Sequence, residues 1–154
     1  MLDNLLHQQV YGVDIDKKAI EFCWKHYHKG KERYKLVAVD QKYPFEDEFF
    51  DIVLCTEVIE HVMNIPFFLG EIKRVLKSEG IILLSTPNYN SLLLKMLEST
   101  ILELIARKRG FTRKILHPNK YTEKRLKVCL EKYFSALEIR NISLGMVLFV
   151  KAKK

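Results

Sequence analysis

Glu57, Glu60 and His61 carry groups that can bind a metal ion or move a proton, and they lie close together after an apolar run over 50–55. Side chains three and four positions apart share one face of a helix, so the three groups converge if this segment is helical. Two carboxylates and an imidazole suit a divalent ion of borderline hardness, which could hold two substrate hydroxyls and acidify one of them. Without a metal, His61 suits a general base for a hydroxyl. A purely structural role is the third interpretation.

These groups need a scaffold, and short apolar runs predict a buried parallel sheet. The runs that we expect to be strands cover 10–14, 34–40, 50–55 and 81–85. Asp14 and Asp40 close the first two strands, and ligands of such sheets bind beyond the carboxyl ends of the strands. Since Asp16 can cap the helix that follows, Asp14 remains for a ligand.

Amphipathic patterns between and after these runs predict helices, so the chain has an α/β fold with crossover connections. The expected helices cover 16–29, 66–77, 91–109 and 121–133. Gly30 and Gly80 are expected to end the first two. Two further strands, 136–142 and 146–151, flank Gly145 and predict a terminal β-hairpin.

The composition is that of one globular domain. The chain has 154 residues, 48% hydrophobic and 29% charged, so it can bury a sizeable core. Its three cysteines, Cys23, Cys55 and Cys129, form no CxxC pair, which argues against a disulfide framework and favours a reducing cytoplasm. No run approaches the roughly 20 apolar residues of a membrane span, and the N-terminus lacks the pattern of a signal peptide. We therefore expect a cytoplasmic protein.

The net charge of +7 is uneven. The segment 107–127 holds nine Lys and Arg residues against one acid, Glu123. A solvated face is one interpretation, and an anionic substrate, a nucleic acid or a membrane surface would use the same charge. The leucine-rich face of the helix expected over 91–109 runs into this segment and would also fit a lipid-like acceptor.

Four segments, in this order, resemble class I S-adenosylmethionine-dependent methyltransferases that act on small molecules. They are VYGVDID (10–16), LVAVDQKYPFEDEFFDIVLCTEVIEHV (36–62), FFLGEIKRVLKSEGIILLSTPN (67–88) and HPNKYTEKRL (117–126). The likeness is to ubiquinone-biosynthesis O-methyltransferases and, more distantly, to small-RNA 2′-O-methyltransferases. It implies a Rossmann-like, doubly wound, mostly parallel sheet with a C-terminal antiparallel hairpin, over a single methyltransferase-like domain at 1–154.

The resemblance also implies S-adenosylmethionine as the cofactor and assigns residues to it. Asp14, with Ile15 beside it, accepts hydrogen bonds from the ribose hydroxyls. Asp40 receives the adenine amino group and Gln41 adds a contact, while Thr56 lines the pocket near the transferred methyl. Asp14 alone would suit a nicotinamide dehydrogenase equally well, but Asp40 and the terminal hairpin favour a methyltransferase.

Members of both families carry a similar ExxEH element with a later histidine and bind a metal there. In those members the histidine lies five residues before a Thr at a helix start, and His117 precedes Thr122 by that spacing. The resemblance therefore implies a divalent metal, such as Mg²⁺, on Glu57, Glu60, His61 and His117. Other methyltransferases carry Glu-His-Val at this turn without a metal, and His61 would then be the catalytic group.

The chain departs from the family pattern at its beginning. The pattern has a strand and a Gly-x-Gly loop before the Asp14 strand, which let backbone amides approach the methionine part of the cofactor. Here Gly12 is the first glycine and all six stand alone. We expect a sheet with its first strand missing, which binds at most the adenosine half of the cofactor. Three explanations of the missing strand stay open. The chain is a truncated gene product or has a misplaced start, the strand is supplied by rearrangement or by a partner chain, or the chain is a non-catalytic relic.

The expected function is methyl transfer to a hydroxyl or similar nucleophile of a small-molecule, lipid or quinone-like acceptor, with 90–120 as a lid over the substrate. A non-catalytic methyltransferase-like binding module and an RNA methyltransferase are the alternatives. An unpaired strand edge would also favour a dimer.

Overall fold

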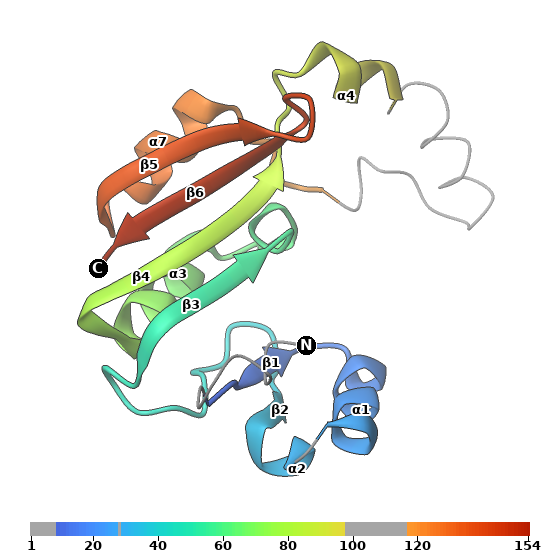
Figure 1. Cartoon of the computed structure of the whole chain (residues 1–154), viewed down its shortest axis with the longest axis vertical. Coiled ribbons are helices and arrows are strands. Elements are labelled where there is room, and N and C mark those ends of the chain that lie inside the picture. Colours follow the sequence, from blue (N-terminus) through green and yellow to red (C-terminus); the bar gives the residue numbers. More distant parts are fainter. Residues whose placement is uncertain (1–8, 28, 98–116) are drawn as a thin grey trace. The chain divides into compact units, whose positions relative to one another are not determined.

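The computed structural model describes residues 9–27, 29–97 and 117–154. The chain divides into two compact units, Met1–Phe45 and Glu46–Lys154, and each is described by itself (Figure 1). The single domain expected over 1–154, with its lid over 90–120, stays a prediction. Among the described residues, no helix combines the length and the apolar character needed to cross a membrane.

The first unit contains two short parallel strands and two helices. In chain order they are β1 (Gly12–Asp14), α1 (Lys17–His26), α2 (Gly30–Arg33) and β2 (Tyr34–Leu36). β1 and β2 pair in parallel, as expected, with Gly12 beside Tyr34. The indole Nε1 of Trp24 donates to the carbonyl oxygen of Tyr34 at 2.8 Å, which ties α1 to the start of β2.

Asp16 caps α1 as expected, because its Oδ1 accepts from the Lys18 amide at 2.8 Å. The predicted end of this helix is wrong: α1 stops at His26, and Gly30 begins α2 instead of ending α1. A Cβ at position 30 would lie 2.6 Å from the carbonyl oxygen of Cys23, so the close approach of the chain to α1 requires glycine.

The second expected strand is also shorter than predicted. β2 ends at Leu36, and a turn follows in which the Gln41 amide donates to the carbonyl oxygen of Ala38 at 3.3 Å. Asp40 lies in this turn with a φ of 55°, so it does not close a strand. Asp residues adopt this left-handed conformation more readily than most, which explains why a strand-like pattern ends early.

The second unit holds a four-stranded sheet. Its elements are β3 (Phe50–Thr56), η2 (Ile59–His61, a 3₁₀ turn), α3 (Ile65–Val75), β4 (Leu76–Pro87), α4 (Leu92–Leu97), α7 (Glu123–Leu130), β5 (Ser135–Ile142) and β6 (Val147–Lys153). The strand order is β3-β4-β6-β5. β3 and β4 are parallel, whereas β6 is antiparallel to both β4 and β5. The predicted hairpin is therefore confirmed, and Gly145 in its turn has a φ of 79°.

Gly80 does not end a helix, contrary to the prediction. α3 stops at Val75, and β4 already begins at Leu76 and runs through Gly80. The β3–β4 register shifts here, since Phe50 lies beside Leu76 and Ile52 beside Ile81. A Cβ on Gly80 would lie 2.9 Å from the carbonyl oxygen of Lys77, so this irregular stretch needs glycine for close backbone approach.

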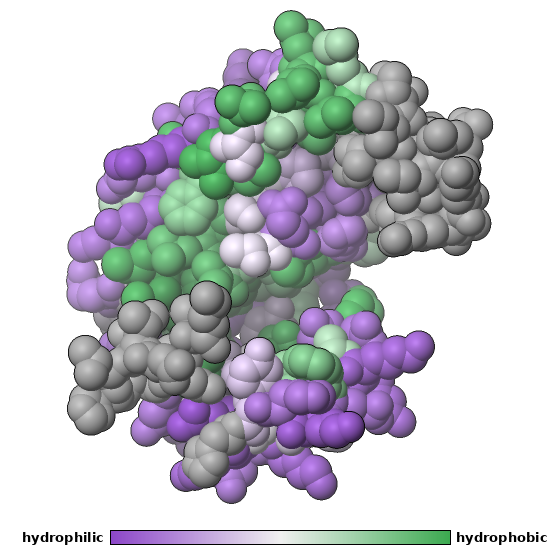
Figure 2. Space-filling view, turned by 45° about the vertical axis from the view of Figure 1, so that its right-hand side comes forward, coloured by the Kyte–Doolittle hydropathy of each residue, from purple (hydrophilic) through white to green (hydrophobic). Residues whose placement is uncertain are grey.

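Helices α3 and α7 lie behind the same face of this sheet (Figure 1). The side chains that form the core between them are almost fully buried: Leu69, Ile72, Val75, Ile82, Leu84, Leu126, Leu130, Leu148 and Val150. On the other face, Ile52 and Leu54 of β3 are each 54% exposed. Strands of a parallel sheet are ordinarily covered on both faces, so this face carries more exposed apolar surface than usual. Figure 2 shows hydrophobic side chains, in green, gathered on the surface of this unit.

The two sheets of the described residues, β1-β2 and β3-β4-β6-β5, are not hydrogen-bonded into one. From the sequence we expect a sheet with its first strand missing. The helix expected over 91–109 begins as α4, and its remainder, with Arg107 and the basic residues up to Lys114, lies outside the described residues. The same is true of 1–8.

Candidate functional site

The chain turns sharply where β3 ends, and this turn positions Glu57. The Glu57 backbone has a φ of 54°, and its amide donates to the carbonyl oxygen of Ser85 at 3.0 Å, which extends the β3–β4 pairing by one bond. The Ser85 hydroxyl donates to Glu57 Oε1 at 2.8 Å. The Glu57 carboxylate is therefore held beside the end of β4.

Glu60 and His61 follow in the 3₁₀ turn η2. The Glu60 side chain is 1% exposed, and its Oε2 accepts from the Thr86 hydroxyl at 3.0 Å. Its Oε1 lies 4.0 Å from Nε2 of His61, whose own side chain is 46% exposed. Burial raises the pKa of the Glu60 carboxyl, and hydrogen bonds from its own backbone and from Thr86 partly oppose this rise. One buried and one accessible group thus stand side by side.

Three hydrogen bonds hold the segment that starts at His117, two of them to this turn and one to the residues after β4. The Asn119 amide donates to the carbonyl oxygen of Glu60 at 3.1 Å, and the Asn119 side-chain amide donates to that of Val62 at 2.5 Å. The Tyr89 amide, just beyond β4, donates to the carbonyl oxygen of Tyr121 at 2.8 Å. Residues far apart in the sequence therefore meet at the carboxyl ends of β3 and β4.

His117 completes a cluster with Glu60 and His61. One ligand atom from each of the three lies within 4.8 Å of the others. The rings of His61 and His117 meet edge to face, with centroids 4.8 Å apart. The Tyr89 hydroxyl lies 2.5 Å from Nδ1 of His117. Two imidazoles and a carboxylate in this arrangement can hold a divalent cation or share a proton.

Glu57 is the one predicted ligand that the structure leaves out of this group. The prediction assumed a helix from Glu57 to His61, but only Ile59–His61 is helical and Glu57 has left-handed backbone angles. Its carboxylate therefore points to Ser85 and is not aligned with Glu60 on a common helix face. The structure groups three of the four expected residues, and the ligand role of Glu57 stays a prediction.

The residues expected to bind the adenosine part lie after the two strands of the first unit. Asp14 Oδ1 accepts from the Asp16 amide at 2.8 Å, and Ile15 is 63% exposed. Asp40 is exposed in its turn, and Gln41 Oε1 accepts from the Ala38 amide at 2.9 Å, so the Gln41 side chain braces the turn itself.

Asp14 and the Asp40 turn follow the carboxyl ends of neighbouring parallel strands, which is where a doubly wound sheet binds its ligand. Thr56 lies in the second unit at the end of β3. The cofactor roles of these residues and of Ile15 and Gln41 stay predictions.

Sequence reasoning missed the residues that support the cluster. They are Thr86, Tyr89 and Asn119. A signal was present for Thr86, because a Ser-Thr pair closes an otherwise apolar strand and a buried hydroxyl needs a partner. Tyr89 and Asn119 could not be found from spacing, since their partners lie 28 and 57 residues away in the sequence.

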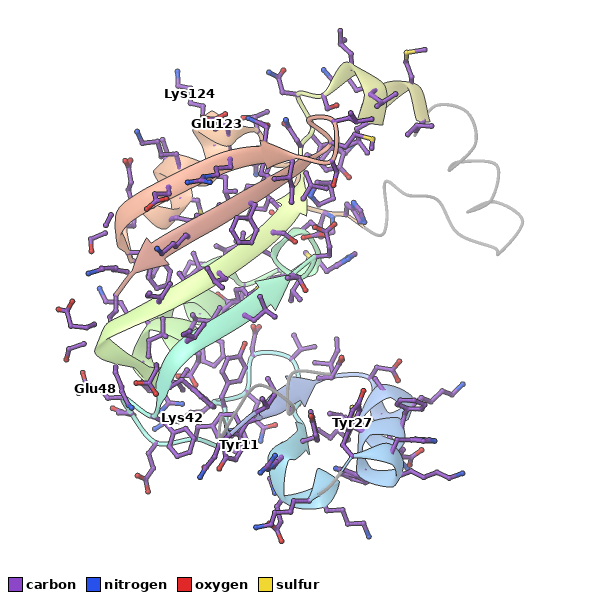
Figure 3. All side chains as sticks on the ribbon, viewed as in Figure 1. Tyr11, Tyr27, Lys42, Glu48, Glu123 and Lys124 are labelled. Carbon is purple, nitrogen blue, oxygen red and sulfur yellow. The ribbon has the colours of Figure 1, made fainter. Side chains whose placement is uncertain are left out.

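The described part of the basic segment lies on and before α7, and its charges are partly engaged. Lys120 Nζ lies 5.1 Å from the ring centroid of Tyr89, and the Arg125 guanidinium 5.6 Å from that of Tyr121. Lys127 pairs with Glu131 at 3.7 Å. In Figure 3 the Lys124 side chain extends outward from α7. It borders an open hollow of about 500 Å³ lined also by Asn90, Thr122, Glu123 and Lys127.

Residues 1–84 match the model of a family described as a methyltransferase domain. The chain is 34% identical over 83 residues to the ubiquinone biosynthesis O-methyltransferase of Pelagibacter ubique, covering 54% of this chain and 35% of that protein. It is 39% identical over 87 residues to the protein of that name from a Bradyrhizobium strain, covering 55% and 34%. The chain thus spans about a third of the length of these curated relatives.

Solved structures show the same fold at low identity. The PH0226 protein of Pyrococcus horikoshii has a TM-score of 0.71 at 19% identity, covering 96% of this chain and 72% of that one. An S-adenosylmethionine-dependent methyltransferase from Archaeoglobus fulgidus has a TM-score of 0.68 at 18% identity, covering 94% and 75%. The Rossmann-like α/β fold expected from the sequence is confirmed. The family match over residues 1–84 and the fold, with its terminal hairpin, agree with each other. This chain therefore belongs to the methyltransferase domain family, among the class I S-adenosylmethionine-dependent methyltransferases.

Proposed function

We propose that this chain takes part in S-adenosylmethionine-dependent methyl transfer to a hydroxyl group, and that Glu60, His61 and His117 hold a divalent cation that receives this hydroxyl. The observation that carries the proposal is the convergence of these three side chains, within 4.8 Å, where β3 and β4 end. Family membership supports the cofactor, because a methyltransferase domain implies a methyl donor.

The donor set fits a borderline cation. Imidazole nitrogens suit Zn²⁺, Co²⁺ or Fe²⁺, and a carboxylate adds affinity for Mn²⁺, whereas Mg²⁺ prefers oxygen ligands throughout. Two imidazoles and one carboxylate therefore favour Mn²⁺, Co²⁺ or Zn²⁺ over the Mg²⁺ named in the sequence analysis. A bound cation would lower the pKa of a coordinated hydroxyl.

The chain's own residues divide the remaining work. Glu60 is buried and held by Thr86, so it supplies a fixed carboxylate. His61 is half exposed and can contact an incoming acceptor. Methyl transfer needs alignment and exclusion of water more than a reactive side chain, because the sulfonium is already activated.

Hydroxyls of small quinone-like or lipid-like molecules are the acceptors that we propose, because curated relatives with 34–39% identity carry the name of ubiquinone biosynthesis O-methyltransferases. Lys120, whose Nζ lies 5.1 Å from the ring centroid of Tyr89 beside His117, would favour an anionic group on the acceptor. A nucleic acid is the second kind of acceptor that this positive charge supports. The three free cysteines support a reducing, cytoplasmic location.

The test is transfer of labelled methyl from S-adenosylmethionine to a catechol, with Mn²⁺ or with excess chelator. Glu60→Gln and His117→Ala should each abolish the Mn²⁺-dependent rate, whereas Glu131→Gln, on the exposed end of α7, should leave it unchanged. Full activity in excess chelator refutes the metal. If His61→Ala then abolishes that chelator-resistant activity, His61 is the general base of a metal-free reaction.

A non-catalytic methyltransferase-like module is the second candidate. It is favoured by the separation of β1-β2 from the four-stranded sheet among the described residues. Calorimetry with S-adenosylhomocysteine separates the two candidates. If the chain binds S-adenosylhomocysteine with micromolar affinity, and Asp14→Ala loses this binding while Asp51→Ala keeps it, the enzyme is supported. If the chain does not bind S-adenosylhomocysteine at high concentration, the module is supported.

A further inference from the structure

We infer that Tyr89 is a positioning residue for the cation site, because its hydroxyl holds Nδ1 of His117 and thereby directs Nε2 of that ring to the metal. The inference rests on the proposed function and adds to it a residue that binds neither cation nor substrate. A bound histidine generally needs such a partner on its second nitrogen, which fixes the tautomer and the plane of the ring.

The contact is short and specific. The Tyr89 hydroxyl lies 2.5 Å from His117 Nδ1. When Nε2 binds a cation its lone pair is engaged, so the ring proton must be on Nδ1, and Nδ1–H then donates to the phenolic oxygen of Tyr89. The reverse arrangement, with the hydroxyl donating to Nδ1, places the ring proton on Nε2 and opposes cation binding there. One hydrogen bond thus links the tautomer of His117 to the occupancy of the site.

Tyr89 is well fixed for this role. Its backbone amide donates to the carbonyl oxygen of Tyr121 at 2.8 Å, so its main chain and its side chain hold both ends of the segment 117–121. Lys120 Nζ lies 5.1 Å from its ring centroid. The residue follows β4, whose end is buried and paired with β6. The hydroxyl is therefore presented from the rigid part of the unit.

Tyr89→Phe removes only the hydroxyl and keeps the ring beneath Lys120. Tyr133→Phe is the matched control. Tyr133 lies three residues beyond α7, and among the described residues its hydroxyl makes no recorded hydrogen bond. Titration calorimetry with Mn²⁺ alone measures the dissociation constant of each. We expect Tyr89→Phe to bind Mn²⁺ about 10- to 100-fold more weakly than the parent chain, and Tyr133→Phe to bind as the parent does.

A spectroscopic measurement on the parent chain makes the test independent of the folding of any variant. With ¹¹³Cd²⁺ as the probe, the one-bond coupling to ¹⁵N should appear on Nε2 of His117, with a proton on Nδ1. The inference is overturned if ¹¹³Cd²⁺ couples to Nδ1 of His117, or if Tyr89→Phe binds Mn²⁺ with the affinity of the parent. Neither result contradicts the cation site itself. If the parent chain binds neither Mn²⁺ nor Cd²⁺, both the cation site and the inference are refuted. If His117→Ala loses Mn²⁺ binding while Tyr89→Phe keeps the affinity of the parent, only the role of Tyr89 is refuted.

Discussion

Replacing Thr86 by Val should destabilise the second unit through Glu60. Thr86 is fully buried, and its hydroxyl donates to Glu60 Oε2 at 3.0 Å. Valine has nearly the same shape but puts a methyl group where the carboxylate needs a donor. The change therefore tests a single hydrogen bond and leaves the packing around it almost unaltered.

The magnitude follows from the charge of the acceptor. A hydrogen bond to a charged group contributes roughly 1.5–3 kcal/mol, against about 0.5–1.5 kcal/mol for a neutral pair. We therefore expect Thr86→Val to lower the free energy of unfolding by about 1.5–3 kcal/mol near neutral pH. In a Glu60→Gln background, where the amide oxygen accepts the same bond without charge, the cost should fall to about 0.5–1.5 kcal/mol.

The loss of stability caused by Thr86→Val should depend on pH. Burial raises the pKa of the Glu60 carboxyl above its ordinary value of 4.5, and the bond from Thr86 opposes that rise. A carboxyl with a raised pKa contributes stability that is present below its unfolded pKa and is lost as the pH rises through its folded pKa. Thr86→Val raises the folded pKa further, so the difference between variant and parent should be smallest below pH 4.5 and grow toward neutral pH.

Urea unfolding followed by far-ultraviolet circular dichroism measures these differences in the parent, both single variants and the double variant. Glu60→Gln alone should be neutral or stabilising near neutral pH, because it removes a buried charge. Equal costs of Thr86→Val in the two backgrounds, or a cost that does not change with pH, would refute the reasoning.

Three further outcomes follow from burial. Ile52→Thr and Leu54→Thr, on the exposed face of β3, should change the free energy of unfolding by less than about 0.5 kcal/mol; a cost above about 1 kcal/mol would contradict the exposure of this face. Leu84→Ala empties a fully buried position and should cost about 2–5 kcal/mol by urea unfolding; a cost under about 1 kcal/mol would mean that Leu84 is not core. Burial raises the pKa of Cys55 to about 12. Cys55 should therefore resist alkylation at mildly alkaline pH, while the part-exposed Cys23 reacts, as measured by mass spectrometry. Equal labelling of the two cysteines would count against the burial of Cys55.

The sequence predicted those elements whose residues all favour the same conformation. The β3 run, the α3 stripe and the terminal hairpin appear where expected, because apolar period and turn chemistry agree there. Gly80 misled the prediction, since glycine between two apolar segments suits a helix end and an irregular strand equally well. Its close approach to Lys77 is a tertiary property that one-dimensional spacing does not encode.

The candidate site was predicted in its chemistry but not in its support. Glu60 and His61 are adjacent and His117 was found through a family spacing, so all three could be named from the sequence. Glu57 does not share a helix face with Glu60, because its left-handed backbone begins the turn before η2 and the i, i+3 rule holds only inside a helix. Its role as a ligand stays a prediction. Tyr89 and Asn119 act across long sequence separations, which only the folded chain reveals.

Trp24 is the single tryptophan of the chain, and its indole is bonded to Tyr34 inside the first unit. Intrinsic fluorescence therefore reports the environment of α1 and β2, while the circular dichroism of the chain is dominated by the larger second unit. A protein that unfolds as one cooperative body gives the same transition with both probes. The placement of one indole thus allows the cooperativity between the two units to be measured on the unlabelled protein.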